Sequence, residues 1–238
     1  MRLHRCAAVL ALFAAAALLP GCSAVTRAKE VKFSGFLKDY SQLKPNPGEG
    51  SIYAYINPKT DFSKYDKVMF EPVVLLAAPD SKLGKAPKED LQALVDYLQA
   101  KAKDEVGKHF PVVDSPGPGV LRVRAALTDA DTKNVIAATA STVSPVGLTL
   151  SGIQMLAMGT TLAAGNASLE CEVTDSVTGE RLAASVDRRV GTMAPDARQF
   201  DKWDHVKAAM DYWVERLVTN FIKLREERAR AAAATPAK

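Results

Sequence analysis

The chain has 238 residues, of which 47% are hydrophobic and 24% charged. This length and composition fit one folded domain with accessory segments, and they exclude a wholly disordered chain, a collagen and a polytopic membrane protein. The formal net charge of +4 includes Arg2 and Arg5, which lie in a segment that we expect to be removed. The mature chain is then nearly neutral, so it has no electrostatic footprint for nucleic acid and we expect no such partner.

Residues 1–21 predict a signal peptide. A basic start is followed by an uncharged run, 6–19, that is shorter than the roughly 20 residues needed to cross a membrane. The run ends in Leu19-Pro20-Gly21-Cys22, which resembles the lipobox of bacterial lipoproteins. That resemblance implies cleavage between Gly21 and Cys22 and lipidation of Cys22 by several acyl chains. The alternative is an ordinary cysteine that follows an ordinary secretory signal.

Several acyl chains on Cys22 would hold a soluble domain stably on a membrane. Ser23 stands where an Asp tends to retain lipoproteins in the inner membrane, so the resemblance implies an outer-membrane lipoprotein that faces the periplasm. Cys171 is then left without a disulfide partner, and an unpaired cysteine in an oxidising compartment is expected to be buried.

Residues 22–50 are interpreted as a lipidated tether. They lack a periodic apolar pattern and end in a stretch rich in proline and glycine, which marks a loop. Within the tether, Phe33, Phe36 and Tyr40 form an aromatic group. These rings either dock the tether on the domain or bind a partner.

The domain itself is expected at 51–229. The apolar run 67–77 predicts a strand covered on both faces, although Pro72 indicates an edge or a bulge there. Apolar residues at steps of three and four predict a helix over 87–106. A short second strand is expected at 109–113.

Alternating apolar and polar residues predict a half-buried strand at 119–128. The same alternation in 167–173 and 182–186 predicts a hairpin with Cys171 on its buried face. A long amphipathic helix is expected at 201–229, followed by a disordered tail at 230–238. The order predicts a single α/β (α+β) domain, in which a mixed sheet of four to five strands carries two main helices on one face.

Residues 134–169 form a Gly- and Ala-rich insertion without a single formal charge. It is interpreted either as a core segment of the domain, or as a surface covered by sister copies, by another envelope protein or by membrane. A lipid-spanning helix is a third alternative, which Gln154 and the many Gly and Thr residues weaken. An exposed apolar surface of this size would be a liability in a free monomer.

Residues that carry chemistry are scarce. His109 and His205 stand far apart, and neither has a nearby Cys or His at metal-ligand spacing, so we expect no metal site. No nucleophile elbow or phosphate loop occurs in the sequence. We therefore expect no catalytic residues, no cofactor and no enzymatic activity.

Two charged groups remain as a possible functional surface. Asp129 and Asp131 form either a carboxylate pair or the polar group of a turn. Asp187, Arg188 and Arg189 form either a ligand site or ordinary surface ion pairs. A cleft that combined Asp129 and Asp187 with the nearby arginines Arg122 and Arg124 would be the site of a binding module.

An ordered set of short motifs resembles the domain-of-unknown-function family 3313 of bacterial lipoproteins, over about residues 31–225. The motifs are Phe33-Ser34-Gly35-Phe36-Leu37, Tyr55-Ile56-Asn57-Pro58, Lys64-Tyr65-Asp66-Lys67-Val68, Pro111-Val112-Val113-Asp114, Leu127-Thr128-Asp129, Thr174-Asp175-Ser176, Asp187-Arg188-Arg189 and Trp203. The resemblance implies a lipoprotein and supplies no catalytic residues.

Two functions are therefore carried forward. The first is a non-enzymatic structural, assembly or accessory factor of the cell envelope, which is anchored through Cys22 and associates with itself or with an envelope protein through 134–169. The alternative is a periplasmic module that binds or hydrolyses a small ligand.

Overall fold

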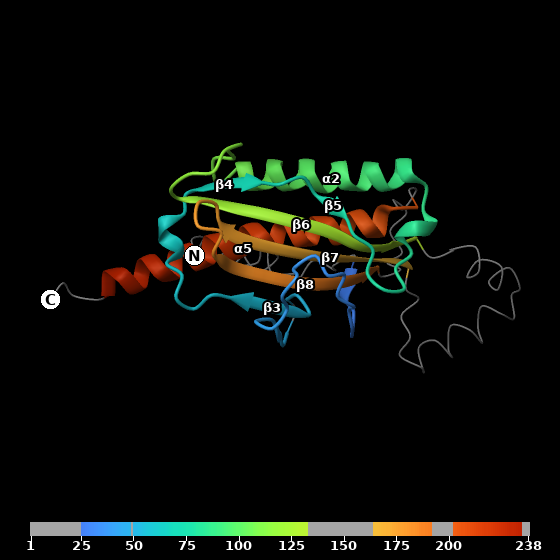
Figure 1. Ribbon diagram of the computed structural model, residues 1–238, viewed down its shortest axis with the longest axis horizontal. Coiled ribbons are helices and arrows are strands. Elements are labelled where there is room, and N and C mark those ends of the chain that lie inside the picture. The colour runs from blue at the N-terminus through green and yellow to red at the C-terminus, as the bar shows by residue number, and fades with distance from the viewer. Residues whose placement is uncertain (1–24, 49, 133–163, 192–201, 235–238) are drawn as a thin grey trace, which may run out of the picture.

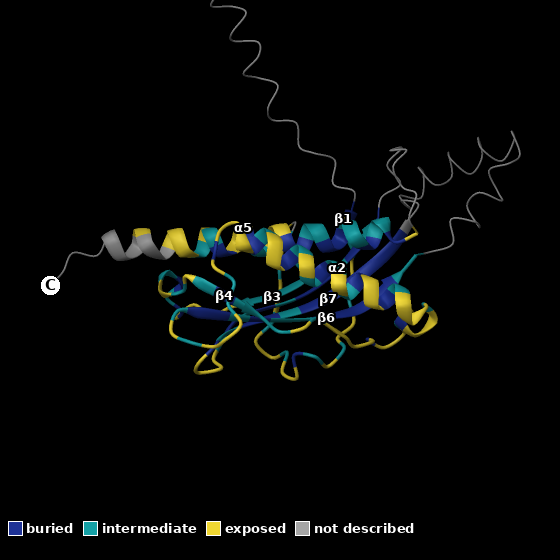
Figure 2. Cartoon of the chain, turned by 90° about the horizontal axis from the view of Figure 1, so that it is seen from above, coloured by how far each residue is buried: buried dark blue, intermediate teal, exposed yellow. Residues whose placement is uncertain are grey.

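The computed structural model describes residues 25–48, 50–132, 164–191 and 202–234. These residues form a single domain in which one mixed sheet of eight strands carries two long helices (Figure 1). Figure 2 shows both helices on the same side of the strands. The predicted α+β class and the two helices on one face are confirmed, whereas the expected four to five strands were too few.

The sheet follows the order β2-β3-β8-β7-β6-β4, with β1 beside β8 and β5 beside β6. Its strands are β1 (Val25–Arg27), β2 (Lys44–Pro45), β3 (Tyr53–Ile56), β4 (Lys67–Phe70), β5 (Val74–Leu75), β6 (Val120–Asp131), β7 (Ala164–Asp175) and β8 (Arg181–Gly191). The long central strands β6, β7 and β8 are antiparallel, and β4 and β5 run parallel to β6. The predicted hairpin is β7 and β8, and both strands are longer than expected.

The segment interpreted as a tether belongs to the fold. Residues 25–27 pair with β8, and residues 44–45 pair with β3. Between them, Leu37 is buried and packs with Phe36 and Tyr40 against the sheet. The interpretation of 22–50 as a tether was therefore wrong for its described part, whereas docking by the aromatic rings is confirmed. Short extended segments of this kind pair with a sheet edge without any long apolar periodicity, which is why the pattern concealed them.

The apolar run at 67–77 is divided into β4 and β5, because Pro72 lies between them and lacks an amide donor. Val74 and Leu75 are exposed, so the expected strand covered on both faces was wrong, and the edge position that Pro72 indicated is confirmed. The strand expected at 109–113 is reduced to one bridge between Val68 and Val112.

The two helices are α2 (Lys88–Gly107) and α5 (Asp204–Ala234). The buried residues of α2 repeat at the helical spacing that predicted it: Leu91, Leu94, Leu98, Ala102 and Val106. The helix α5 continues to Ala234, so the expected disordered tail was wrong for 230–234. The helices pack on each other, and their apolar faces form the core with the sheet.

The central strands also shorten the uncharged insertion. Because β7 begins at Ala164, residues 164–169 form part of the sheet, and 133–163 lie outside the described residues. Gly165 makes the entry into β7 possible, since its φ is +65° and a Cβ there would lie 2.7 Å from the carbonyl oxygen of Asp131. The absence of charge over 165–169 thus reflects a part of β7 that is buried on both faces.

Candidate functional site

The structure separates the residues of the expected functional surface. Successive side chains of a strand point to opposite faces, so Asp187 and Arg189 of β8 point toward the helices, whereas Arg188 points to the other face. Asp129 lies on the same face as Arg188, with 3.6 Å between its carboxylate and the guanidinium. A single cleft that joins Asp129 to Asp187 therefore does not exist, because the sheet lies between them.

Asp187 and Arg189 form a buried ion pair, with 2.7 Å between Arg189 Nε and Asp187 Oδ2. Their side chains are 3% and 2% exposed, so the alternative of ordinary surface ion pairs was wrong for these two residues. The indole of Trp213 donates a hydrogen bond to the same carboxylate oxygen at 2.8 Å. Arg189 in turn donates to the hydroxyl of Tyr212 at 2.9 Å and lies over its ring. The pair links β8 to α5 and is enclosed by both elements.

Asp129 anchors a loop rather than facing an open surface. Its Oδ1 accepts hydrogen bonds from Ser81 Oγ at 3.0 Å and from the amide of Lys82 at 2.9 Å. Asp131 forms an ion pair with the same Lys82. A register shift between Leu127 and Asp129 turns the strand so that Asp129 reaches the loop. Of the two alternatives for Asp129 and Asp131, the structure therefore supports the polar group of a turn, because Asp129 holds the loop at Ser81 and Lys82.

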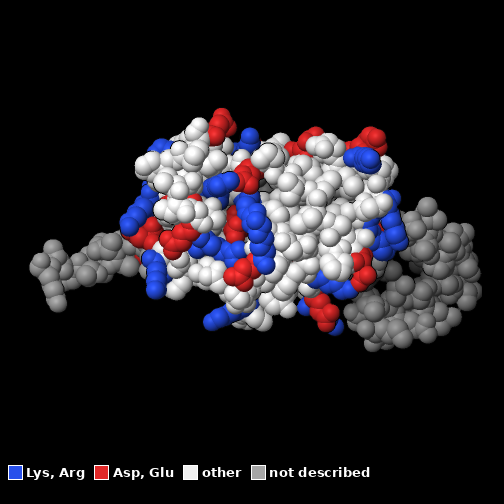
Figure 3. Space-filling model, in the orientation of Figure 1, with Lys and Arg blue, Asp and Glu red and all other residues white. Residues whose placement is uncertain are grey.

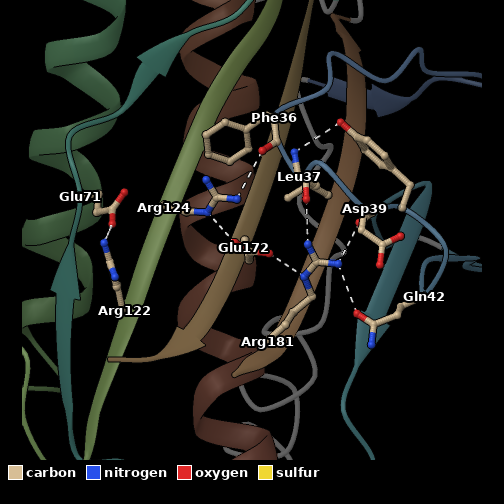
Figure 4. Close-up of polar contacts among 10 residues, drawn as sticks. Phe36, Leu37, Asp39, Gln42, Glu71, Arg122, Arg124, Glu172 and Arg181 are labelled. Carbon is tan, nitrogen blue, oxygen red and sulfur yellow. Dashed lines mark hydrogen bonds and ion pairs between the residues drawn. The ribbon is translucent and has the colours of Figure 1, made fainter. Parts of the chain in front are cut away.

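Arg122 and Arg124 lie on the face away from the helices, and each has a separate acidic partner. Arg122 forms an ion pair with Glu71, and both side chains are substantially exposed. Arg124 donates to Glu172 of β7 at 2.5 Å, and Arg181 of β8 donates to the other oxygen of the same carboxylate at 2.5 Å. Figure 4 shows Glu172 between the two guanidinium groups.

These arginines also hold the segment that covers them. Arg181 donates to the backbone carbonyls of Leu37 and Asp39, each at 2.8 Å. Arg124 donates to the carbonyl of Phe36 at 3.3 Å and lies 4.5 Å from the centre of its ring (Figure 4). Side-chain donors thus satisfy carbonyls that no strand pairs, and residues 36–39 stay on the sheet for that reason.

Glu170, two residues before Glu172, is fully buried under the same segment. Its carboxylate accepts hydrogen bonds from the amide of Ser34 and the hydroxyl of Tyr40, both at 2.6 Å. Burial raises the pKa of Tyr40 to about 12, and the hydrogen bond to Glu170 adds to the shift. Sequence reasoning missed this site, because alternation alone assigns the two glutamates to a solvated face. The aromatic group at 33–40 was the available signal.

We name Glu170, Glu172, Arg124, Arg181 and Tyr40 the polar-face cluster. Each of its charged groups has a partner of opposite charge or a hydrogen bond. The cluster therefore has a structural role, in which it holds residues 34–40 on the sheet. A carboxylate that already accepts two short bonds is a poor general base, because its lone pairs are occupied.

A second candidate site is a cavity of about 410 Å³ between the sheet and the helices. Small side chains form its inner surface on the strands: Ala125, Cys171, Ala183 and Ser185. Burial raises the pKa of the Cys171 thiol to about 12, so this cysteine is not a nucleophile near neutral pH. The predicted position of Cys171 on the buried face of the hairpin is confirmed, since Cys171 packs against the core between the sheet and the helices.

His109 and His205 lie in the described part of the chain and are not part of a group of metal ligands there. The described residues contain no group of three or more potential metal ligands. His205, in the first turn of α5, is partly buried, and desolvation holds its pKa below the usual value. Gly21, Cys22 and residues 133–163 lie outside the described residues. Within the described ranges, neither long helix has an apolar stretch that would cross a bilayer.

The chain is distantly similar to several solved structures. The dodecameric PelC from Paraburkholderia phytofirmans aligns with a TM-score of 0.38 at 8% identity, over 71% of this chain and 94% of that one. Protein XCC0632 from Xanthomonas campestris aligns with a TM-score of 0.34 at 11% identity, over 76% and 94% of the two chains.

A sequence relative is closer. The chain is 30% identical over 139 residues to the uncharacterized lipoprotein YdcL of Escherichia coli K12. The match covers 58% of this chain and 61% of that protein, so the chain spans about three fifths of the length of the relative. The family model described as "Protein of unknown function (DUF3313)" matches residues 32–217, a range that contains the polar-face cluster and the buried pair of β8. The chain belongs to the DUF3313 family, as its motifs predicted.

Proposed function

We propose that the protein is a lipid-anchored lipoprotein of the outer membrane, facing the periplasm, that acts as a non-enzymatic assembly or accessory factor of the cell envelope. The observation that carries the proposal is an exposed edge without charge at residues 72–79. Val74, Leu75 and Leu76 are 42%, 39% and 38% exposed. Where β5 runs in Figure 1, Figure 3 has a broad area without charged side chains.

An edge of this kind favours association with another protein. In the described part of the chain β5 pairs on one side with β6, and no strand pairs with its other side. Exposed apolar edges are sites of strand pairing or of contact with a partner, and monomeric proteins usually protect them with charges. The uncharged residues 134–163 follow β6 in the chain and are the second segment that we propose for contact with a partner.

The charged groups support a structural role over a catalytic one. The polar-face cluster fastens a covering segment, and the pair of Asp187 and Arg189 is enclosed between β8 and α5. Neither set leaves a free acid and base around an open space, which acid–base catalysis requires. A non-enzymatic function is therefore the better proposal for the described residues.

Site-specific photocrosslinking in intact envelopes tests the association. A photoreactive residue at Leu75 is expected to capture either a ladder at multiples of the mature mass or a discrete heterologous band. Val177 is the matched control, because it is also apolar and is 64% exposed at the turn between β7 and β8. Capture that is equal at both positions, or absent at Leu75, would contradict the proposal.

Deletion of 140–160 should weaken the captured complexes while the domain stays folded, since β7 is left intact.

Membrane fractionation tests the anchor and the location. Cys22→Ala should release the protein from membranes, because the acylated residue is lost. Ser23→Asp should move it from the outer-membrane to the inner-membrane fraction of a density gradient. Retention of Cys22→Ala in the outer membrane would contradict a lipid anchor at this residue.

A further inference from the structure

The cavity between the sheet and the helices is larger than packing requires. Protein interiors are close-packed and hold few voids larger than a water molecule. A space of about 410 Å³ falls instead in the range of about 300 to 1,000 Å³ that is typical of small-molecule sites. Small residues line it from both layers, with Ala102 on α2 and Ala125, Cys171 and Ser185 on the sheet, and side chains of this size leave the space unfilled.

The wall of the cavity is mainly hydrocarbon and aromatic. Its larger apolar residues are Leu98, Val123, Leu169, Val173, Trp213, Leu217 and Phe221. Cys171 contributes a thiol that burial keeps protonated, so it adds no charge to the inside. An apolar space of this size excludes free ions and polar metabolites and accepts a hydrocarbon chain.

The most exposed lining residues lie on α5, from its middle toward its C-terminal end, and on β3. They are Ile56, Arg216, Asn220, Lys223 and Glu227. The cavity therefore opens between these two elements. On the side of α2, the lining residues Leu98 and Ala102 are buried. The partly exposed Glu71 and Gln99 already have partners there, since Glu71 is paired with Arg122 and Gln99 accepts a hydrogen bond from the amide of Val73.

Arg216 gives this opening its charge. Lys223 has Glu227 as an ion-pair partner at 3.8 Å, whereas Arg216 has no ion pair or hydrogen bond with any described residue. A guanidinium binds a carboxylate or phosphate with two parallel hydrogen bonds. It stands here at the entrance of an apolar space, where the head of an amphiphile would lie when its tail is inside.

We propose that this cavity binds an anionic amphiphile with a single hydrocarbon chain, whose chain occupies the space lined by Ala125, Cys171 and Ser185 and whose head group pairs with Arg216. The inference rests on the cavity and its charged entrance, and it does not depend on the proposed assembly function. The polar residues that the sequence analysis singled out do not include this site, because small and apolar residues carry no chemical signature.

Titration of the purified protein with laurate tests the proposal. Trp213 lines the cavity, so a laurate derivative brominated on its chain should quench tryptophan fluorescence saturably. Unmodified laurate should reverse the quenching by competition. Dodecanol has the same chain without the charge and should compete at least about tenfold more weakly. Absence of saturable quenching would overturn the proposal.

Variants assign the two ends of the ligand. Ala125→Leu and Ser185→Leu each fill the space and should weaken laurate binding at least about tenfold, with an unchanged or raised Tm. Unfolding of both would show that the space is not available and would overturn the proposal, as would undiminished binding in a folded variant.

Arg216→Gln should weaken laurate binding about tenfold and leave dodecanol unaffected. Arg225→Gln is the matched control, since Arg225 is an exposed arginine on the same helix outside the cavity. Equal effects of the two arginine variants would contradict the role of Arg216 and leave only non-specific attraction of the anion.

Discussion

The two faces of the sheet are covered in different ways. The face toward α2 and α5 is apolar, and its one strongly buried ion pair in the described residues, Asp187 with Arg189, is enclosed with Trp213. The opposite face carries Glu170 and Glu172, and residues 31–43 cover it with a few rings and many hydrogen bonds. The helices are thus held by burial of apolar area, whereas the covering segment is held by polar bonds to the sheet.

The difference explains where the molecule tolerates open space. A cavity on the apolar face costs only the van der Waals contacts that larger side chains would have made, and it removes no hydrogen-bond partner from a polar group. The polar face has no such freedom, because a buried carboxylate without partners costs several kcal/mol. Each glutamate on that face therefore has a donor from the covering segment or from a neighbouring arginine.

Asp187→Ala is expected to have the largest effect. It leaves the guanidinium of Arg189 enclosed without its carboxylate, and the removal of one partner of a buried pair costs about 3–5 kcal/mol. Urea unfolding followed by circular dichroism measures the loss. Arg188→Ala is the matched control, because Arg188 lies in the same strand on the other face with 35% of its side chain exposed, and about 1 kcal/mol is expected. Equal losses would show that the two faces do not differ in this respect.

Glu172→Gln should cost about 2–3 kcal/mol, which is less than the loss of Asp187, because Arg124 and Arg181 keep 25% and 15% of their side chains exposed. Without the ion pairs to Glu172, Arg124 and Arg181 should hold residues 36–42 less firmly on the sheet. The backbone amides of these residues should then exchange hydrogen faster, while those of α5 do not. Glu71→Gln is the control, since its partner Arg122 is 43% exposed and about 0–1 kcal/mol is expected. Faster exchange throughout the chain would point to general destabilisation instead.

Tyr40→Phe removes a donor from the buried carboxylate of Glu170 and should cost about 1–2 kcal/mol. The pKa of Tyr40 is raised from 10.0 to about 12, so the folded protein keeps a proton that the unfolded chain loses between these pH values. The contribution of Tyr40 to the free energy of unfolding is therefore fully present below pH 10 and is lost as the pH rises toward 12. Tyr40→Phe should reduce this loss of stability with pH.

Unfolding midpoints measured between pH 9 and pH 12 test this slope. Tyr97, whose pKa burial also raises to about 12, should leave a residual slope in the variant. Tyr55→Phe is the matched control, because Tyr55 packs in the same cluster and its hydroxyl has no hydrogen bond within the described residues. An identical slope in wild type and Tyr40→Phe would contradict the role given to this hydroxyl.

Periodicity predicted the parts of the fold that long-range burial controls. The spacing of Leu91, Leu94 and Leu98 located α2 to within a residue at each end. The alternation around Cys171 located the hairpin and the face of the thiol. These patterns work because one stripe or one face of each element is buried against the core.

Such patterns could not predict the position of the covering segment or the burial of charged residues on the polar face. Residues 25–27 form a strand only because β8 offers them a free edge, and nothing in three residues encodes that pairing. The burial of Glu170 depends on Tyr40, which is 130 residues away in the chain. The triplet at 187–189 was singled out from the sequence, but the sequence could not predict which of the three residues face the helices. That depends on which face of the sheet the helices cover, and the local sequence does not encode it.

Phe36→Leu is expected to have the smallest effect and isolates the aromatic part of the covering segment. The guanidinium of Arg124 lies 4.5 Å from the centre of the Phe36 ring, and a partly exposed contact of this kind contributes about 0.5–1 kcal/mol. A double-mutant cycle with Arg124→Met separates it from the lost packing of the ring and from the ion pair with Glu172. A coupling energy of about 0.5–1 kcal/mol is expected from urea unfolding of the four proteins. A value of zero would mean that hydrogen bonds to the backbone carbonyls alone hold this segment, and the ring at position 36 would then serve only to exclude water from the polar-face cluster.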